Sequence, residues 1–308
     1  MKLMIIRSAT PYDYAGIANI NVLAFEERAD EALIVALHRH RTLFDPELSL
    51  VAEDEDGQLI GHALFSPMLL RISGATVRAV NLGPIAVNPT IQRQGVGAAL
   101  ITRGHELARA KGHVLCFLLG HPTYYPRFGY VPHAFGTSSC EILTYALPDS
   151  DLDTRKPQAV DVPLLRDLWR HEEANVDFAV DPGDCLLDWL SPNPLITSSV
   201  YVLNEEVVGY TRIHRDEPQS PGVFLSRDDD SARKMARMIG GGARVELPLH
   251  PASASATAFP DAHIAAKSWE PSMVCALEPS PFDAYYAEVN AGRRPPGRPI
   301  WPVAFEIA

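Results

Sequence analysis

The chain has 308 residues, of which 46% are hydrophobic, and it carries a formal net charge of −11. This length and apolar content can fill more than one core, so two domains are expected. The acidic balance argues against nucleic acid as the main partner. It is typical of a solvated surface, or of a protein that attracts a cationic amine.

The cysteines Cys116, Cys140, Cys185 and Cys275 are scattered and form no CxxC or Cys/His pair. They predict reduced, mostly buried thiols and no metal site. The N-terminal segment has too few apolar residues for a signal peptide, and no apolar run is long enough to span a bilayer. We therefore expect a cytoplasmic protein without a membrane partner.

The first 40 residues predict a strand and two helices. Residues 4–7 indicate the strand. Thr10 and Pro11 predict a helix start, because a cap residue precedes proline at the first helical position. Apolar residues at helical spacing carry this helix to Ala24, and a second helix is predicted around residues 33–37. Some side chains here are interpreted as ordinary packing or surface residues: Phe25, His38 and His40.

Residues 48–87 predict a meander of strands. Strands over 48–53 and 59–72 are joined by an acidic turn, 54–57, whose glycine supplies a positive φ. A third strand over 77–87 ends in the apolar run NLGPIAV, which has no helical stripe and is typical of a buried strand.

The segment after this strand predicts a glycine-bearing turn that opens a helix. Asn88-Pro89 breaks regular structure, and Gln92-Arg93-Gln94-Gly95-Val96-Gly97 begins a helix that ends near Lys111-Gly112. Such a turn aims backbone N–H groups at one point, which suits an anion such as a pyrophosphate. A glycine pair also occurs where a helix merely packs on a sheet, and neither GxGxxG nor GxxxxGK[ST] is present.

A second apolar strand follows at 114–119. It should lie parallel to the strand that ends at Val87, because helix crossovers join parallel neighbours. Residues 120–130, GHPTYYPRFGY, are dense in aromatic side chains and proline.

Together these segments resemble the GNAT family of N-acetyltransferases. Gln92-x-x-Gly95-x-Gly97 after an apolar strand is similar to the family's motif A, Q/R-x-x-G-x-G/A, and 125–130 is similar to its closing Y-x-x-x-G-F/Y. The resemblance implies an α/β GNAT fold over residues 1–147, with a central mixed sheet flanked by helices. It also implies acetyl-CoA as co-substrate, without a metal.

The resemblance further implies roles for individual residues. The pantetheine arm would pair with free backbone groups of the first parallel strand, and the turn would bind the pyrophosphate. Tyr125 would protonate the departing thiolate, since a neutral phenol can donate as negative charge develops. Tyr124 is the alternative, because adjacent side chains in a short helical turn point apart. The two N-terminal helices would form one wall of the acceptor site. The implied cofactor-binding residues are Ile85, Ala86, Val87, Gln92, Arg93, Gln94, Gly95, Val96, Gly97 and Ala98.

The sequence departs from the family pattern at two positions. Leu118 stands where the family has an asparagine, and His121 either substitutes for it or is a loop residue. Asn81 stands where some members have a basic carboxylate, and Asn81 cannot act as a base. A water chain to solvent remains an alternative to three carboxylates that could take the proton of the amine: Glu26, Glu27 and Glu53.

The second half predicts a repeat of the same plan after a polar linker, 148–156. A helix over 162–173, a strand–turn–strand over 200–210 and a helix over 231–239 make residues 157–308 resemble a degenerate GNAT domain. An unrelated α+β domain is the alternative. The place of the pyrophosphate turn is taken by 226–230 (SRDDD), whose carboxylates would repel a diphosphate, so this unit should not bind coenzyme A.

Other parts of the chain carry weaker signals. A strand over 138–147 is expected to close the first domain, and a terminal strand is expected over 301–307. Loops are expected over 251–260 and 292–299. The second domain would shape the acceptor pocket or supply an interface for a homo-oligomer, and the sequence leaves both open.

These features predict transfer of the acetyl group of acetyl-CoA to a primary amine of a small molecule or peptide, by direct attack in a ternary complex. One alternative is an acyltransferase that uses a longer acyl-CoA, or an aminoglycoside or polyamine as the acceptor. Another is a non-catalytic module that senses acyl-CoA.

Overall fold

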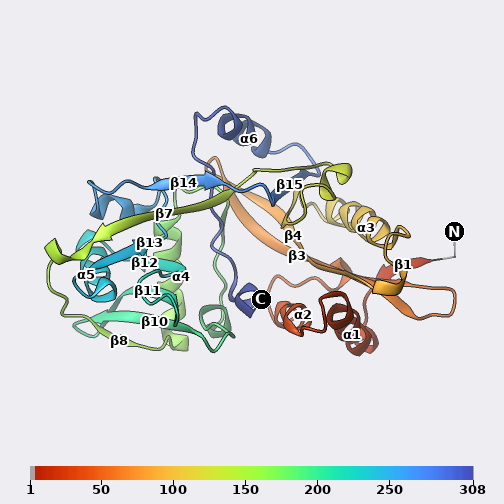
Figure 1. Cartoon of the computed structure of the whole chain (residues 1–308), viewed down its shortest axis with the longest axis horizontal. Coiled ribbons are helices and arrows are strands. Elements are labelled where there is room, and N and C mark those ends of the chain that lie inside the picture. The colour runs from red at the N-terminus through yellow and green to blue at the C-terminus, as the bar shows by residue number, and fades with distance from the viewer. Residues whose placement is uncertain (1–3, 308) are drawn as a thin grey trace.

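The computed structural model describes residues 4–307, so residues 1–3 and 308, which the expected domain ranges include, lie outside the described part (Figure 1). A large mixed sheet organises the N-terminal half, with strand order β1-β2-β3-β4-β5-β15-β6 and β9 added against β3. β4 and β5 are parallel, as predicted, and the other pairs are antiparallel. The strands are β1 (Ile5–Ser8), β2 (Ser49–Glu53), β3 (Leu59–Ile72), β4 (Ala75–Val87), β5 (Leu115–Leu119), β6 (Tyr130–Val131), β9 (Ala179–Val180) and β15 (Ser272–Ala276).

Helices cover both faces of this sheet. α1 (Tyr14–Ala24) and α2 (Asp30–His38) lie on one face, and α3 (Val96–Ala110) lies on the other (Figure 1). Successive side chains of a strand point to opposite faces, so β3 serves both layers. Its Leu64 packs with the α1 and α2 side chains, whereas Phe65 packs with α3. The predicted GNAT arrangement of a mixed sheet between helices is therefore present.

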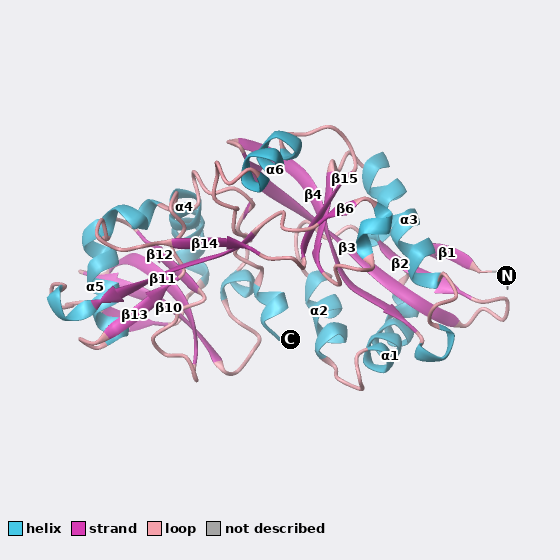
Figure 2. Ribbon diagram, turned by 45° about the horizontal axis from the view of Figure 1, so that its top comes forward, coloured by secondary structure: helices cyan, strands magenta, loops and turns pink. Residues whose placement is uncertain are grey.

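The C-terminal half contains two smaller sheets, seen apart from the large sheet in Figure 2. One has the order β12-β11-β10-β8 and the other the order β13-β7-β14. The elements are β7 (Gly136–Leu143), β8 (Asp153–Arg155), α4 (Val162–Glu172), β10 (Ile196–Leu203), β11 (Glu206–His214), β12 (Val223–Ser226), α5 (Asp229–Gly240), β13 (Arg244–Leu247), β14 (Ala265–Ser268) and α6 (Phe282–Asn290).

An ion pair at the start of each half supports the expected repeat. Arg7, in β1, forms a bidentate ion pair with Asp13, and both N–O distances are 2.7 Å. Arg155, in β8, pairs in the same way with Asp161, with N–O distances of 2.7 and 2.8 Å. Each aspartate also accepts the backbone N–H three residues before it, at 2.7 Å. Each pair therefore fixes a strand to the helix that follows, α1 in one half and α4 in the other. The second half is a GNAT-like unit that repeats the plan of the first.

The strand expected to close the first domain, over 138–147, belongs to a different sheet. β7 pairs with β13 and β14, and its Cys140 and Ile142 are buried in a core of the second half. The place beside β5 is taken by β15, which the sequence analysis did not predict. β15 also pairs with β6, so the boundary at 147 does not separate two independent sheets. The pairing partners lie far apart in the sequence, which is why local patterns did not reveal them.

Other expectations also need correction. Residues 153–155 of the expected linker form β8, an edge strand that pairs with β10. The expected terminal strand is instead a 3₁₀ helix, Val303–Ile307, which packs against α2 and brings the Phe305 ring to 4.8 Å from the His38 ring. The loop over 251–260 contains a short 3₁₀ helix, Ala254–Ala258. No helix within residues 4–307 has the length and apolar character needed to cross a bilayer.

Candidate active site

The glycine-bearing turn forms the N-terminus of α3. Gly95 has a φ of +92°, a backbone conformation that residues with a Cβ rarely adopt. Glycine is therefore needed here for the turn itself. The Ala99 N–H donates to Gly95 O at 3.0 Å, so the N–H groups of Val96, Gly97 and Ala98 precede the first helical hydrogen bond. The first turn of α3 has no acidic residue. The positive end of the helix dipole is therefore uncompensated and suited to an anion.

Gly97 is required for a different reason. A Cβ at this position would lie 2.9 Å from the hydroxyl of Tyr124, so the tyrosine occupies the space that a side chain would need. The Arg127 guanidinium stacks on the Tyr124 ring with its carbon 4.1 Å from the ring centroid, and Tyr124 also packs against Phe128. Tyr124 is thus held against the α3 turn.

The remaining turn residues connect β4 to the helix. The Gln92 side chain donates to Val87 O at 3.2 Å, which ties the turn to the end of β4. Arg93 has a φ of +64°, and Gln92, Arg93 and Gln94 are exposed. The ten residues implied as cofactor-binding therefore lie on one continuous stretch, from the end of β4 to the first turn of α3.

β4 and β5 separate where the predicted arm would enter. Their pairing ends at Asn81 and Phe117, and the Asn81 side chain donates to Phe117 O at 3.1 Å. Beyond this point β4 remains paired only with β3, through Ile85, Ala86 and Val87. Among residues 4–307, no strand lies beside the other edge of β4 there. Asn81, which cannot act as a base, instead bridges the two strands at the point of separation.

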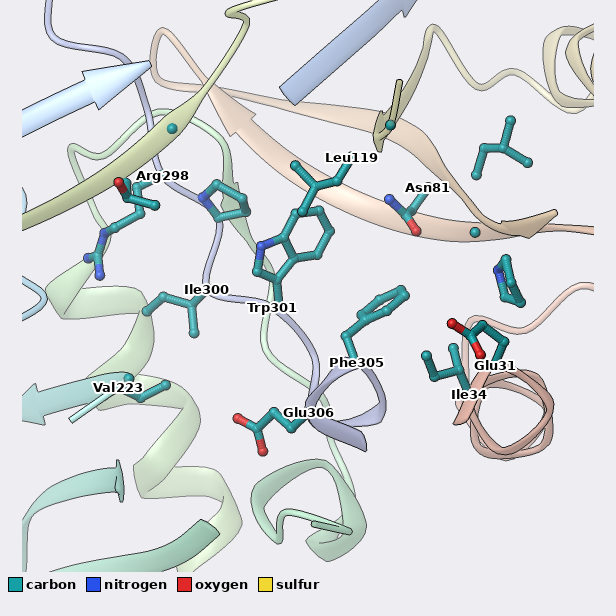
Figure 3. A pocket seen from close by; sticks show the side chains of 18 of the residues that line it. Glu31, Ile34, Asn81, Leu119, Val223, Arg298, Ile300, Trp301, Phe305 and Glu306 are labelled. Atoms are coloured by element: carbon teal, nitrogen blue, oxygen red, sulfur yellow. The ribbon is translucent and has the colours of Figure 1, made fainter. Parts of the chain in front are cut away.

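A cavity of about 740 Å³ opens beside this separation, between the two halves of the chain (Figure 3). We call it the central cavity. Its walls come from α1–α2, β4, the end of β5, β7, the β11–β12 region and the segment 298–306. The lining residues include Phe25, Glu31, Ile34, Asn81, Leu82, Gly83, Pro84, Ile85, Leu119, Gly120, His121, Tyr125, Arg212, Val223, Arg298, Ile300, Trp301, Phe305 and Glu306.

Tyr125 lines the central cavity, whereas Tyr124 is not among its lining residues. The Tyr125 ring lies against the end of β5, where a Cβ on Gly120 would be 2.3 Å from it. The side chain is 9% exposed, and burial raises the pKa of Tyr125 to about 12. The phenol therefore keeps its proton at neutral pH.

Two residues that depart from the family motif, Leu118 and His121, lie in different surroundings. Leu118 is 1% exposed and belongs to the core around α3, so this position is structural. His121 is exposed and lines the central cavity.

The carboxylates considered from sequence lie outside the cavity lining. Glu26 and Glu27 are exposed, and Glu53 forms an ion pair with Arg7 at 2.5 Å on the far part of β2. Glu31, which the sequence analysis missed, lines the cavity from α2 and is 8% exposed. Its spacing of three residues from Ile34 could have revealed it, because the two share the buried face of a helix.

The second half contributes two buried ion pairs to the cavity wall, and neither was predicted. Arg212 pairs with Glu306 at 2.6 Å, and Arg298 pairs with Glu173 at 2.5 Å. Burial raises the pKa of Glu173 to about 7, although Arg298 opposes this shift. The contacts join residues of β11 and α4 to the C-terminal segment, so they depend on the tertiary fold.

The corresponding helix of the second half has a different N-terminus. α5 is capped by Asp228, whose carboxylate accepts the Ser231 N–H at 2.8 Å. The chain's own anion thus occupies the position that the turn of α3 leaves open. Within the described range 4–307, no three or more His, Cys, Asp or Glu side chains are grouped as a metal site would need.

A comparison of sequences matches this site to known proteins. A family profile described as an acetyltransferase (GNAT) domain matches residues 5–132. The uncharacterized N-acetyltransferase YhbS of Escherichia coli strain K12 is 33% identical over 127 residues, which cover 41% of this chain and 73% of YhbS. The chain belongs to the GNAT family of acetyltransferases. Family membership supports acyl transfer as its general class of activity.

Solved GNAT structures extend the similarity of fold to the second half. A GCN5-related N-acetyltransferase from Anabaena variabilis superposes with a TM-score of 0.68 at 14% identity, covering 90% of this chain and 73% of that protein. Another from Kribbella flavida gives a TM-score of 0.66 at 16% identity, covering 89% of this chain and 71% of that protein. These matches show that the fold is shared across both GNAT-like units.

Proposed function

We propose that the protein transfers the acetyl group of acetyl-CoA to a primary amine by direct attack within a ternary complex. The observation that carries the proposal is the continuity of three features. The open N-terminus of α3 lies at one end of the unpaired β4 edge, and the central cavity meets that edge at Pro84 and Ile85. Tyr125 faces the same space.

In this proposal the turn binds the cofactor through its backbone. The N–H groups from Arg93 to Ala98 hold the diphosphate, and the backbone of Ile85, Ala86 and Val87 pairs with the pantetheine arm. One of these strand N–H groups polarises the thioester carbonyl. Holding the acetyl donor and the amine together in the cavity removes most of the entropic cost of their encounter.

Tyr125 is proposed to protonate the thiolate. The amine attacks the carbonyl carbon, the C–S bond breaks, and the Tyr125 hydroxyl donates its proton to the sulfur. The phenol regains a proton from the nitrogen of the new amide. Its burial supports this role, because a phenol that stays protonated at neutral pH is ready to donate.

The test compares the wild-type chain with Tyr125→Phe in an assay of free coenzyme A release across a panel of amines. We expect kcat to fall by about 100-fold in the variant, within the range for loss of general acid catalysis, while acetyl-CoA binding by calorimetry stays unchanged. Tyr124→Phe is the matched control, because the Tyr124 ring packs against Phe128 and does not line the cavity, so kcat should stay near the wild-type value.

Other outcomes would favour the alternatives. Equal turnover in Tyr125→Phe would remove that residue from the mechanism. Acetyl-CoA binding without thiol release for any amine would favour a sensor of acyl-CoA. Faster release from longer acyl-CoA donors would instead identify a different acyl group.

A further inference from the structure

The charged side chains that line the central cavity differ in how they are neutralised. Arg212 and Arg298, 3% and 7% exposed, each hold a carboxylate of the second half, Glu306 and Glu173 respectively. This end of the cavity is therefore close to electrically balanced. An anionic substrate would have to displace a carboxylate already in contact with each guanidinium.

Buried atoms without a hydrogen bond also occur in these two pairs, but each of those side chains contacts an opposite charge at 2.5 or 2.6 Å. Glu31, at the opposite end, has no ion pair that short among the described residues. Its Oε2 atom is buried and has no hydrogen-bond partner. Its nearest cation, Arg28, lies 3.8 Å from the other oxygen and has a side chain that is 59% exposed. An exposed pair of this length contributes little, so most of the charge of Glu31 remains available. A carboxylate that is buried without a partner is costly to the fold, which indicates that a ligand supplies the missing partner.

The position of Glu31 places it near the reacting atoms. Figure 3 shows Glu31 and Ile34 projecting from α2 into the same part of the cavity that Asn81 enters from the sheet. That part is bounded by the unpaired end of β4, where Pro84 and Ile85 line the wall. An amine bound to Glu31 would thus lie on the side where the thioester is proposed to arrive.

The rest of this compartment is apolar and comes from both halves of the chain. Phe305 and Trp301 stand between Glu31 and the Arg298 end of the cavity (Figure 3). The first half adds other apolar side chains to the same walls. Such walls favour an apolar body on the acceptor, because its burial removes apolar surface from water. The apolar residues that the first half adds to these walls are Phe25, Ile34, Leu82, Ile85 and Leu119.

We propose that Glu31 binds the ammonium group of a primary amine with an apolar aromatic body, an arylalkylamine, and takes one proton from it. The inference rests on the proposed acetyl transfer and names the acceptor and the base for it. The Glu31 carboxylate accepts one proton from the ammonium, which leaves a neutral amine with its lone pair free. That lone pair forms the C–N bond as the C–S bond breaks, Tyr125 protonates the sulfur, and the second nitrogen proton restores the phenol.

The same arrangement selects against other amines. A polyamine would bring a second ammonium towards the apolar walls formed by Trp301 and Phe305, and the nearby carboxylate of Glu306 is already paired with Arg212. An α-amino acid would bring a carboxylate near Glu31 itself. The weakly paired carboxylate of Glu31 in an apolar compartment fits a substrate with a single positive charge.

The first experiment measures acceptor preference in the wild-type chain by coenzyme A release at pH 7. The probes are 2-phenylethylamine, spermidine and phenylalanine. We expect kcat/KM for 2-phenylethylamine to exceed that for each of the other two by at least about 10-fold, the scale of one buried charge or apolar contact. Faster turnover of spermidine or phenylalanine would overturn the assignment of the acceptor while leaving acetyl transfer intact.

The second experiment compares Glu31→Gln with Glu27→Gln, an exposed position in the connection between α1 and α2 and outside the cavity lining. With 2-phenylethylamine we expect kcat/KM to fall about 100-fold in Glu31→Gln and to stay unchanged in Glu27→Gln. Raising the pH should recover much of the loss, because solvent then supplies neutral amine. Acetyl-CoA binding should be the same in both variants.

A neutral nucleophile separates proton removal from a structural role. p-Toluidine is an aromatic amine that is uncharged at pH 7, so it needs no base before attack. Glu31→Gln should turn it over within about 3-fold of the wild-type rate. An equal loss for both amines, or none for either, would overturn the role of Glu31. Absence of turnover by the wild-type chain with every amine would instead overturn the proposed function.

Discussion

At the scale of single residues, packing decides which members of a motif face the central cavity. The adjacent tyrosines illustrate this: Tyr125 enters the central cavity, while the Tyr124 hydroxyl fills the space over Gly97. The two glycines of the motif are likewise needed for different reasons, Gly95 for its positive φ and Gly97 for the close approach of a neighbour. The sequence identified all four residues but could not distinguish their roles.

Buried histidines should make the fold sensitive to acid. Burial lowers the pKa of both His38 and His62 to about 3, from an ordinary value of 6.5. The unfolded chain then binds more protons than the native one below pH 6.5, so stability falls as the pH drops from 6.5 towards 3. Each histidine should remove about 1.4 kcal/mol per pH unit over this range.

The measurement is urea denaturation at several pH values between 7.5 and 5. His62→Asn should have a shallower dependence of unfolding free energy on pH, although losing contacts with Asn21 and Ser49 will lower its stability at pH 7.5. His40→Gln, an exposed position, is the control and should match the wild-type slope. An unfolding free energy that stays constant from pH 7.5 to 5 would contradict this account.

At the scale of elements, α3 links the core of the first half to the proposed cofactor site. Its N-terminus carries the open turn, and Leu100 and Ile101 anchor it in the core. Gly104 allows the helix to approach β3 closely, because a Cβ there would lie 2.0 Å from the Phe65 ring. The position of the turn therefore depends on a contact more than two helical turns away.

Gly104→Ala tests this dependence. In an exposed helix the change would stabilise by about 1 kcal/mol, but here the Phe65 ring must move, and we expect destabilisation of about 1–3 kcal/mol. Acetyl-CoA affinity should also weaken, since the α3 N-terminus shifts with the helix. Chemical denaturation and calorimetry provide the two measurements.

Two further variants support the interpretation of that result. Arg103→Ala, exposed on the same helix, should change stability by less than about 0.5 kcal/mol. Adding Phe65→Leu to Gly104→Ala should recover part of the lost stability, because the smaller side chain leaves room for the methyl group. If Gly104→Ala alone stabilised the protein, the Phe65 ring would have to move without loss of stability, which would contradict the prediction.

At the scale of the whole molecule, the C-terminal half completes the first sheet. β15 lies between β5 and β6, and its Met273 and Val274, both fully buried, contribute to the cores on opposite faces of that sheet. The segment that follows returns Trp301 and Phe305 to the central cavity. The proposed division into 1–147 and 157–308 therefore describes a repeat in the chain, with a strand of the second unit built into the first sheet.

A fragment of residues 1–147 should fail to form a stable monomer. Without β15 the edge of β5 is unpaired and the cores on both faces lose buried side chains, which favours aggregation. Size-exclusion chromatography and near-ultraviolet circular dichroism should show aggregates or a loosely packed chain. The same fragment joined by a flexible linker to residues 265–291 is the control and should regain cooperative unfolding. A monomeric, cooperatively folding 1–147 would contradict the prediction.

The local sequence determined much of the fold and the glycine-bearing turn. Strand and helix patterns predicted β2, β3, β4, α3 and β5 in order, because alternation, helical spacing and turn residues act between near neighbours. The glycine-bearing turn followed from the same local signals, whereas the role expected for Tyr125 came from the family resemblance. The family resemblance, carried by these motifs, gave the mixed sheet and the second GNAT-like unit.

Only the tertiary structure decided which distant residues meet. The pairing of Ser272 with Leu119 and the approach of Glu306 to Arg212 join segments far apart in the chain, and no periodic pattern encodes such contacts. The same holds for Glu31, whose importance arises from the cavity that it faces. The sequence determined the elements because their formation is local. The central cavity was decided by the packing of the two halves against each other, which depends on shape and burial.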